Sequence, residues 1–515
     1  MNTTSNPPTG VQFSQKQPDG VITRNYLDTL SFWRDYPERD VEFVRWYPCD
    51  VGPLNAKEIF ATSHGRTDNT ATFYMHIPFC NHLCTSCPYN KFHTRNQVVE
   101  RYLHALKNEI DTYSRLPYLR DVELISGYLG GGTPTTLRPS QLDDLLKHMR
   151  SRFNIRKGSS LTVESTPVDI DERRLHVLME NGVDRISLGV QTFHDSLIRH
   201  LGRSHAHTRK RSIETIEMLK REGMENICID LMIGIPGQTM ALWEEDLDIL
   251  MSLPVNSFSI YLYLVLPASD AFFRIQSGQA PVCPPAAEQD AMYWRMVDKV
   301  LSNNYVAVTC NDFGGPLTQD WIDGGVKTYP ISNDPHKPYK GLETNTFYLT
   351  DHLTHSWYEC GDMLSLGSGA YGYMNHHMYL NEPNVERYIG LAGAGTIPIT
   401  MGSYTDAQER MARSLVLGLK LLRVKRADFQ RAHGIDLYAV FQEQIDWLVA
   451  QELVELTDDA LQVTFPKGWF YIDNISKRFY SARNYRLPQP SPSSTDVLRW
   501  RRPQTIAESK EVHHV

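Results

Sequence analysis

The residues best suited to chemistry in this chain are three closely spaced cysteines, Cys80, Cys84 and Cys87, in the stretch FYMHIPFCNHLCTSCPYNKF. Their Cys-x3-Cys-x2-Cys spacing lets three thiolates converge on one face of a short loop, and thiolates are the usual ligands of iron–sulfur centres. A cluster of four irons held by three cysteines keeps one iron free for another molecule, whereas clusters that only carry electrons are usually closed by four cysteines. The triplet therefore predicts a [4Fe-4S] cluster with one iron open to chemistry.

Two other uses of the cysteines have to be weighed. Zinc is commonly held by cysteine and histidine together, and three histidines lie close enough in sequence to leave a mixed zinc site open: His76, His82 and His93. Isolated cysteines are commonly core residues, which explains four thiols that stand alone later in the chain: Cys228, Cys283, Cys310 and Cys360. A core role does not explain a tight triplet.

Two further features could contact a ligand. Gly130, Gly131 and Gly132 have no Cβ, so their peptide groups can approach a bound molecule closely, although an ordinary turn explains the same glycines. Glu164 stands alone in an apolar run. It is either a paired core carboxylate or a hydrogen-bond acceptor for a ribose or an ammonium group.

The elements that must position these residues alternate between short apolar runs and amphipathic stretches. The runs at 161–164, 185–190, 227–232 and 258–263 predict buried parallel strands, and 212–221 predicts a helix between two of them. Repeated strand-then-helix units predict an α/β barrel or part of one. The polar segments follow the strand ends, which is where barrel enzymes build their sites.

Taken together, these segments resemble the radical S-adenosylmethionine (SAM) superfamily, and specifically the oxygen-independent coproporphyrinogen III oxidase (HemN-like) family. The resemblance covers about residues 25–485. It rests on the cysteine triplet with its preceding Tyr74-x-His-Ile-Pro-Phe and on four later segments in the family's order: GGGTPT at 130–135, VESTP at 163–167, RISLGVQTF at 185–193 and IDLMIGIP at 229–236. It implies a partial (β/α)6 TIM-like radical SAM barrel with a small C-terminal α/β cap domain.

The resemblance also implies the cofactors, a [4Fe-4S] cluster and two SAM molecules. In the family the amino and carboxylate groups of SAM bind the open iron, and homolysis gives methionine and a 5′-deoxyadenosyl radical. The residues implied at the first SAM are Tyr74, Gly131, Gly132 and Glu164. Those implied at the second SAM are Gln191, Arg203 and Asp230, with Gly132 and Thr133 completing the pocket and Tyr371 at a further contact position.

Departures from the family pattern bear on the reaction. Ser86 stands where the oxidase has an aromatic residue, Tyr89 where it usually has a fourth cysteine, and Leu264 where it has a small residue. An Arg-Tyr-Thr-Ser-Tyr-Pro run is represented only by RWYP at 45–48, and an Asp-His-Phe becomes NDF at 311–313. These changes favour a rebuilt pocket, hence class C methyl or methylene transfer to an sp2 carbon of a conjugated or aromatic substrate.

Two alternatives stay open. One is coproporphyrinogen oxidation, for which Arg45 and Arg95 could bind porphyrin carboxylates, and the other is a non-catalytic haem chaperone of the same family. The aromatic segment at 371–379 could line a flat pocket, although such stripes more often belong to the core. For either enzyme the resemblance implies an electron donor such as flavodoxin or ferredoxin.

Composition limits the class of protein. The chain has 515 residues, of which 41% are hydrophobic, and it has no apolar stretch of membrane-spanning length. The net charge of −8 disfavours nucleic-acid binding, and the N-terminus lacks the layout of a secretion signal. Eight cysteines, three of them assigned to an air-sensitive cluster, favour a reducing compartment. We therefore expect a cytoplasmic monomer that binds neither nucleic acid nor membrane.

The predicted domain organisation has six parts. Beyond residue 400 the pattern changes to helices at 408–422 and 441–453, followed by a turn and strand at 456–464. The parts are a disordered arm (1–22), an N-terminal extension (23–70), the radical SAM barrel (71–310), barrel completion and connector (311–400), a HemN-like C-terminal domain (401–487) and a disordered tail (488–515).

Overall fold

The computed structural model describes residues 46–60, 69–203, 205–265, 269–332, 334–343, 351–481 and 484. The predicted disordered arm, the predicted disordered tail and most of the predicted N-terminal extension lie outside the described residues, as does Arg45.

Six parallel strands form the centre of the largest sheet. They are hydrogen-bonded in chain order, and every neighbouring pair is parallel. The strands are β2 (Thr70–Ile77), β5 (Glu123–Gly131), β6 (Asn154–Ser165), β7 (Arg185–Gln191), β8 (Asn226–Ile233) and β9 (Ser257–Leu262). The four strands predicted from the sequence lie on β6 to β9, but β6 begins seven residues before its predicted run and Tyr263 lies just past the end of β9.

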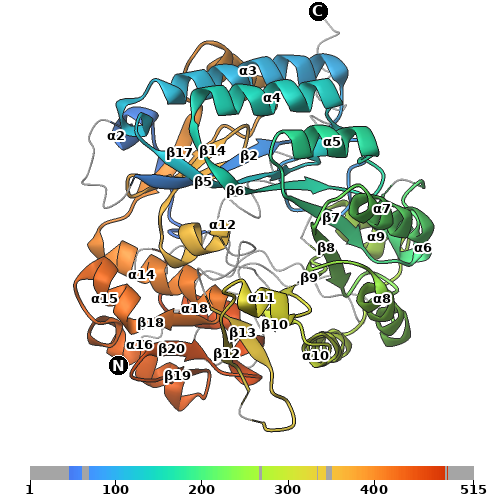
Figure 1. Ribbon diagram of the computed structural model, residues 1–515, viewed down its shortest axis with the longest axis vertical. Helices are drawn as coiled ribbons and strands as arrows, with labels where there is room; N and C mark the ends of the chain where they lie inside the picture. Colours follow the sequence, from blue (N-terminus) through green and yellow to red (C-terminus); the bar gives the residue numbers. More distant parts are fainter. Residues whose placement is uncertain are drawn as a thin grey trace, which may run out of the picture.

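Helices connect these strands and cover the outside of the sheet. They are α3 (Asn96–Ser114), α4 (Pro139–Arg152), α5 (Glu172–Glu180), α7 (Arg209–Arg221) and α8 (Met240–Ser252), with two short helices, α6 (Asp195–His200) and α9 (Asp270–Gln276). Asp171, Thr208 and Thr239 cap α5, α7 and α8 by accepting a backbone N–H of the first turn, as N-cap side chains do. The predicted helix at 212–221 lies within α7. This alternation is the predicted partial (β/α)6 barrel (Figure 1).

The sheet continues beyond the six strands at both edges. At one edge β14 (Asp362–Leu366) pairs with β2 in parallel, and antiparallel strands follow it: β15 (Tyr371–Met374), β16 (His377–Asn381), β17 (Ile399–Tyr404) and β1 (Gly52–Pro53). At the other edge lie β11 (Asp312–Gly314), β10 (Val306–Ala307), β13 (Lys340–Leu342) and β12 (Thr328–Pro330). Further elements complete this part: α2 (Ala56–Phe60), β3 (Phe79–Cys80), β4 (Phe92–His93), α10 (Ala286–Ser302), α11 (Gln319–Asp323), α12 (Asp351–Leu353) and α13 (Val385–Gly393).

Glu109 of α3 joins the added strands to the barrel. It is fully buried and accepts hydrogen bonds from the Tyr388 hydroxyl (2.5 Å), the Gly367 backbone N–H (2.9 Å) and the Asn381 side-chain amide (2.9 Å). Burial raises the pKa of this carboxyl to about 7, although its three donors act in the opposite direction. The carboxyl therefore links α3, α13 and the loop after β14.

The C-terminal region is a small α/β unit below the barrel in Figure 1. It contains α14 (Ala407–Gly418), β18 (Arg423–Lys425), α15 (Arg426–His433), α16 (Leu437–Ala450), β19 (Val454–Leu456), β20 (Ala460–Val463), α17 (Lys467–Phe470) and α18 (Ile472–Lys477), with β20 central in a three-stranded sheet. One continuous hydrophobic core runs through this unit and the barrel. A buried ion pair between Lys420 and Asp473 lies inside the unit, and Asp473 also faces the cavity described below.

Three sequence predictions for this unit need correction. The helix predicted at 408–422 ends at Gly418, because residues 419–421 tighten into a 3-10 turn and Leu422 takes a left-handed conformation (φ 68°). The helix predicted at 441–453 begins earlier and ends at Ala450. The turn and single strand predicted at 456–464 are a β-hairpin, β19 and β20, whose turn is held by the Thr457 hydroxyl.

None of the helices in the described part of the chain has both the length and the apolar character that crossing a bilayer requires.

Candidate active site

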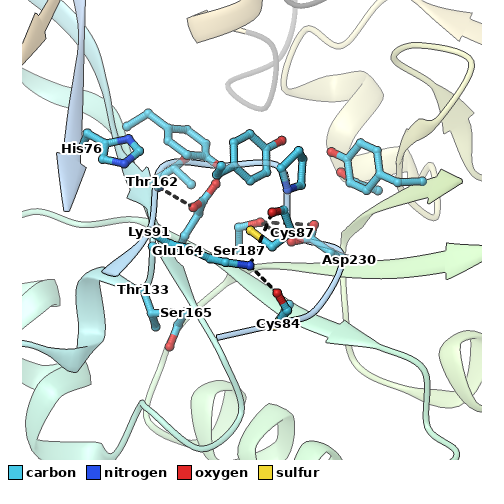
Figure 2. A pocket seen from close by; sticks show the side chains of 18 of the residues that line it. His76, Cys84, Cys87, Lys91, Thr133, Thr162, Glu164, Ser165, Ser187 and Asp230 are labelled. Atoms are coloured by element: carbon cyan, nitrogen blue, oxygen red, sulfur yellow. Dashed lines mark hydrogen bonds between the residues drawn. The ribbon is translucent and has the colours of Figure 1, made fainter. Parts of the chain in front are cut away.

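A cavity of about 560 Å³ lies at the carboxyl ends of the parallel strands, beside the cysteine loop. This volume is in the range of ligand-binding pockets. Figure 2 shows side chains that line it, among them Cys84, Cys87, Glu164 and Asp230. All twelve residues that the sequence analysis assigned to the site line this one cavity: Tyr74, Cys80, Cys84, Cys87, Gly131, Gly132, Thr133, Glu164, Gln191, Arg203, Asp230 and Tyr371. Their individual roles stay predictions.

The cysteine loop is held in place by Lys91, which the sequence analysis missed. The ammonium group of Lys91 donates to the backbone carbonyl of Cys84 and, at 3.4 Å, to that of Cys87 (Figure 2). The Thr133 hydroxyl lies 3.6 Å from the sulfur of Cys80, toward which it donates. Lys91 carries no sequence signal, because a lysine four residues after a cysteine is ordinary in any loop.

Asn90 joins the same loop to the loops that follow β14 and β16. Its buried amide donates to the carbonyls of Ser368 (3.2 Å) and Pro383 (3.0 Å), both nearly 300 positions away in sequence. Short parallel pairing of β3 with β4 and a bond from the Thr94 N–H to the Cys80 carbonyl (3.0 Å) close the base of the loop. The cysteine loop is therefore held by three sets of contacts: the pairing of β3 with β4, the hydrogen bonds of Lys91 and the hydrogen bonds of Asn90.

The three thiols fit a cluster better than a single metal ion. All three are free of disulfides and face the cavity. Burial, and secondarily the neighbouring Cys87, raises the pKa of the Cys80 thiol to about 12, so its thiolate needs compensating positive charge, which coordinated iron supplies. Among the described residues no three His, Cys, Asp or Glu side chains converge as ligands of one ion.

The histidines near the triplet do not complete a zinc site. Both ring nitrogens of His76 are engaged, Nε2 donating to the Asn90 carbonyl (2.9 Å) and Nδ1 accepting from the Tyr74 hydroxyl (2.9 Å). His82 and His93 are exposed side chains. The mixed zinc site that the sequence left open therefore has no geometric support.

The glycine run brings β5 against Glu164 and His76. Gly131 has a positive φ of 108°, and its N–H donates to one Glu164 oxygen (3.0 Å), while the Tyr128 hydroxyl donates to the other (2.8 Å). A Cβ on Gly131 would lie 2.3 Å from the His76 ring, and one on Gly130 would lie 2.8 Å from Glu164. Glycine is therefore required at these two positions by close contacts with His76 and Glu164, and an ordinary turn would not require it. Burial raises the pKa of Glu164, so a bound cation would stabilise its carboxylate form.

The residues assigned to a second SAM also lie together, around Gln191. Gln191 is 7% exposed, has a φ of 72°, and its side-chain oxygen has no hydrogen-bond partner among the described residues. Burial, followed by the charge of Glu164, raises the pKa of Asp230 to about 7. A buried unpaired acceptor costs about 1–3 kcal/mol, and left-handed backbone at a non-glycine residue adds strain. Both are features of sites prepared for a ligand.

Two further residues of this region were missed by the sequence analysis. His207 is 2% exposed, and its Nδ1 accepts from Arg203 at 3.3 Å. Burial, followed by the charge of Arg203, lowers the pKa of His207 to about 2, so the ring is neutral. Arg185 lines the cavity from the start of β7, close to Asp230 and Asp312. Arg185 is the one charged residue in the apolar run at 185–190, which could have identified it.

The structure shows which of the residues that bear on the choice of substrate line the cavity. Ser86, Tyr89 and Leu264 line the cavity. Arg95 does not, since it is exposed at the start of α3, and its suggested role in binding porphyrin carboxylates stays a prediction.

In the segment at 371–379, Tyr371 reaches the cavity, whereas Tyr373 and Tyr379 are buried. Tyr373 packs against the Arg413 guanidinium at 4.1 Å, and the Tyr379 hydroxyl accepts from the Ser365 N–H at 2.7 Å. The core interpretation of this aromatic segment is therefore the better one.

Comparisons with known proteins agree with this geometry. Residues 74–250 match the family model described as Radical SAM superfamily, and residues 405–471 match the HemN C-terminal domain. The chain is 29% identical over 396 residues to the heme chaperone HemW of Bacillus subtilis, covering 76% of this chain and 94% of that protein. It is 25% identical over 455 residues to the oxygen-independent coproporphyrinogen III oxidase of Pseudomonas aeruginosa, covering 85% of this chain and 93% of that protein.

A solved structure has the same fold. Coproporphyrinogen III oxidase (HemN) from Escherichia coli superposes with a TM-score of 0.66 at 22% identity, covering 80% of this chain and 91% of that one. The two domain matches occur in this order along one chain, and the relatives are covered over most of their length. Along most of its length the chain is similar to the HemN-like family of the radical SAM superfamily, whose cofactors are a [4Fe-4S] cluster and SAM.

Proposed function

We propose that this protein is a SAM-dependent radical enzyme whose substrate is a tetrapyrrole. One observation carries the proposal: the cysteine loop, Glu164 and the group formed by Gln191, Arg203 and Asp230 all face a single cavity. The tetrapyrrole is supported by the relatives, which are named for heme and for coproporphyrinogen III.

The charges in the cavity suit SAM. Glu164 and Asp230 are half-buried residues of β6 and β8 that line the cavity, and burial raises the pKa of both carboxyls. Such groups gain stability when a positive charge enters the cavity. SAM carries two positive groups, a sulfonium and an ammonium, and one carboxylate. The guanidinium of Arg203 can bind that carboxylate through two hydrogen bonds. The same cavity would hold a free inorganic anion poorly, because two carboxylates already lie close together.

The division of labour between cofactor and protein follows from these contacts. When bound, the cluster and SAM together supply a carbon radical that can abstract hydrogen from a substrate. The three cysteines would hold the cluster, and Tyr74, Gly131 and Glu164 would hold the first SAM. A second SAM would lie against Gln191, Arg203 and Asp230. The buried walls exclude water from the reacting groups, which protects a radical from side reactions.

The comparisons favour oxidase or chaperone chemistry over the methyl transfer predicted from the sequence. Relatives covered over more than nine-tenths of their length are named as a heme chaperone and as a coproporphyrinogen oxidase. The departures at Ser86, Tyr89 and Leu264 support a changed pocket, but a changed pocket does not require a methyl acceptor. We therefore place oxidative hydrogen abstraction from a tetrapyrrole ahead of methyl transfer.

A haem chaperone is the second candidate. It is supported by the 29% identity to HemW over 94% of that protein. In this case the cavity would still hold the cluster and SAM, while haem would leave the protein unchanged. The orphaned oxygen of Gln191 and the neighbouring Arg203 and Asp230 favour the enzyme, because a carrier needs no second polar set beside its cluster.

One anaerobic experiment separates these functions. The reconstituted protein is given SAM and reductant with coproporphyrinogen III or haem, and 5′-deoxyadenosine and the mass of the tetrapyrrole are followed. The proposal expects 5′-deoxyadenosine formation that rises at least tenfold with a tetrapyrrole, together with a changed tetrapyrrole mass. Haem that binds in equal amount and is recovered unchanged, with no stimulated SAM cleavage, would establish the chaperone instead. Formation of S-adenosylhomocysteine together with a tetrapyrrole that is heavier by one carbon unit would show that the reaction is methyl transfer.

A matched pair of variants tests the polar group. Asp230→Asn removes an ionisable carboxyl from the cavity, whereas Asp144→Asn makes the same change on the exposed face of α4, where Asp144 is 64% exposed. Asp230→Asn is expected to keep its iron and lose at least 90% of turnover, while Asp144→Asn keeps both. Equal turnover in the two variants would show that the group around Asp230 is not part of the site.

A further inference from the structure

Part of the cysteine loop lies at the protein surface, at the edge of the cavity. Between the first two cysteines of the triplet, Asn81, His82 and Leu83 are exposed, and Leu83 exposes 41% of its surface. Leu83 therefore places an apolar side chain in water beside Cys84, a predicted cluster ligand. This is therefore the point at which another protein can come nearest to Cys84.

Two short helices pack directly against this exposed part of the loop. The Thr85 N–H donates to the Leu201 carbonyl (3.0 Å) and its hydroxyl to the His200 carbonyl (3.4 Å), both at the end of α6. The Ala271 N–H, in the first turn of α9, donates to the Thr85 carbonyl at 3.4 Å. Gly202 permits the contact, because its φ is 71° and a Cβ there would lie 2.8 Å from the Thr85 methyl. The ends of α6 and α9 thus frame the loop around Cys84, and both helices lie at the right of Figure 1.

These helix ends carry positive charge that the described part of the chain does not neutralise. Arg199 is exposed, Arg274 is half-buried, and neither forms an ion pair with a described carboxylate. Both lie close enough to His200 to lower its pKa, although burial is the larger cause. The nearest acidic side chain on α6, Asp195, caps the Arg209 N–H at 2.8 Å. Asp270, in the first turn of α9, is the other exposed carboxyl in this neighbourhood.

We propose that the patch formed by Leu83, Arg199, His200 and Arg274 is the docking site for a small acidic one-electron carrier protein of the flavodoxin or ferredoxin class. This rests on the proposed function, since only a redox-active cluster needs a reductant. One electron leaves the reduced carrier, which is thereby oxidised, and enters the cluster through the loop around Cys84. No bond of this protein forms or breaks in the transfer.

The overall charge of the protein makes the patch selective. With a net charge of −8 the protein repels an acidic partner at long range, so productive encounters need a local positive region. Leu83 provides an apolar centre and the two arginines a charged rim, which is the usual anatomy of an interface. Complexes of electron carriers are among the smallest interfaces, so a patch of a few side chains is sufficient.

The test uses charge reversals on the reconstituted protein. Arg199→Glu and Arg274→Glu each change the net charge by two units beside the loop, and Lys157→Glu makes the same change in the first half of β6, at the opposite end of the strands. The first measurement is the affinity for oxidised flavodoxin, by titration calorimetry at low and at high salt. We expect each arginine variant to bind at least tenfold more weakly than the Lys157→Glu control at low salt, with the difference shrinking at high salt.

The second measurement is SAM cleavage driven by flavodoxin and its reductase, compared with cleavage driven by dithionite, which needs no docking surface. The arginine variants are expected to lose at least fivefold with flavodoxin and to equal the control with dithionite. Unchanged flavodoxin affinity and unchanged flavodoxin-driven rates, repeated with a ferredoxin, would overturn the docking site. Absence of dithionite-driven cleavage in the unmodified protein would count against the proposed function alone, because the affinity measurement does not depend on it.

Discussion

Replacement of Lys91 by methionine tests how the cysteine loop is held. Lys91 reaches across the loop and donates to the backbone carbonyls of Cys84 and Cys87, so it bonds to main chain and not to the sulfurs. Methionine has a similar length and fills the same space without a charge or a donor. The change therefore removes two hydrogen bonds and leaves the three cluster ligands in place.

The size of the effect follows from these two bonds. A hydrogen bond from a charged group contributes about 1.5–3 kcal/mol when it is well formed. The bond to Cys87 is long at 3.4 Å, and Lys91 is half-buried, so water competes with both bonds. We take about 2 kcal/mol for the pair, which corresponds to about a thirtyfold shift toward the open loop, since 1.4 kcal/mol is tenfold.

The assay is the rate at which an iron chelator removes the cluster under anaerobic conditions. Cluster loss requires the loop to open locally, so the rate follows the population of the open form. We expect Lys91→Met to lose iron about thirtyfold faster than the unmodified protein, by the free energy estimated above. Lys91→Arg, which keeps charge and donors, is expected to lose iron at an intermediate rate. Lys157→Met, the same change on an exposed strand position, is expected to behave like the unmodified protein.

The same iron-loss rate in Lys91→Met and in Lys157→Met would refute the reasoning. It would mean that Asn90 and the base of the loop hold the cysteines without help from Lys91. A lower unfolding temperature in Lys91→Met alone would point to a general loss of stability, so thermal unfolding of the metal-free proteins is measured in parallel.

Three further predictions follow from the same contacts. Gly131→Ala is expected to lower SAM affinity at least tenfold at unchanged iron content, because its Cβ would lie 2.3 Å from the His76 ring; equilibrium dialysis with labelled SAM measures this. Glu164→Gln is expected to weaken SAM binding by a similar factor in the same dialysis, and affinity equal to that of the unmodified protein would remove Glu164 from the SAM site. Glu109 binds its proton up to about pH 7 when folded, against an ordinary value of 4.5, so its contribution to stability falls by about 3 kcal/mol as the pH rises through this window. Glu109→Gln should flatten that fall in denaturant unfolding at pH 5 and pH 8, and an unchanged pH dependence would contradict the assignment.

Much of the barrel and the site could be predicted from local sequence. Buried parallel strands read as continuous apolar runs, and the four predicted runs lie on β6 to β9. The site residues were found for a related reason. In parallel strands every carboxyl end lies at the same edge, so residues that follow successive strands, such as Glu164 and Asp230, must converge. Glycines and cysteines also carry distinctive chemistry that a reader can recognise in a short segment.

Other features could not be predicted because they depend on segments far apart in the chain. Asn90 holds the cysteine loop through carbonyls near residues 368 and 383, and no local pattern reports such a bond. Helix ends in the C-terminal unit were misplaced because apolar periodicity continues past Gly418, whereas the backbone there tightens and then turns left-handed. Lys91 and His207 were missed because lysine and histidine are ordinary residues until their partners are placed around them.

The sequence by itself determined the chemistry that this protein can carry, since the type and spacing of Cys80, Cys84 and Cys87 specify thiolate ligands for an iron–sulfur cluster with an open iron. Only the tertiary structure decided how that chemistry is held and reached. The bonds of Asn90 to distant carbonyls, the burial that raises the pKa values of Glu164 and Asp230, and the meeting of α6 and α9 beside the cysteine loop all arise from contacts between distant segments. Spacing along a chain sets which ligands can converge, whereas burial and electrostatics exist only once the chain is packed.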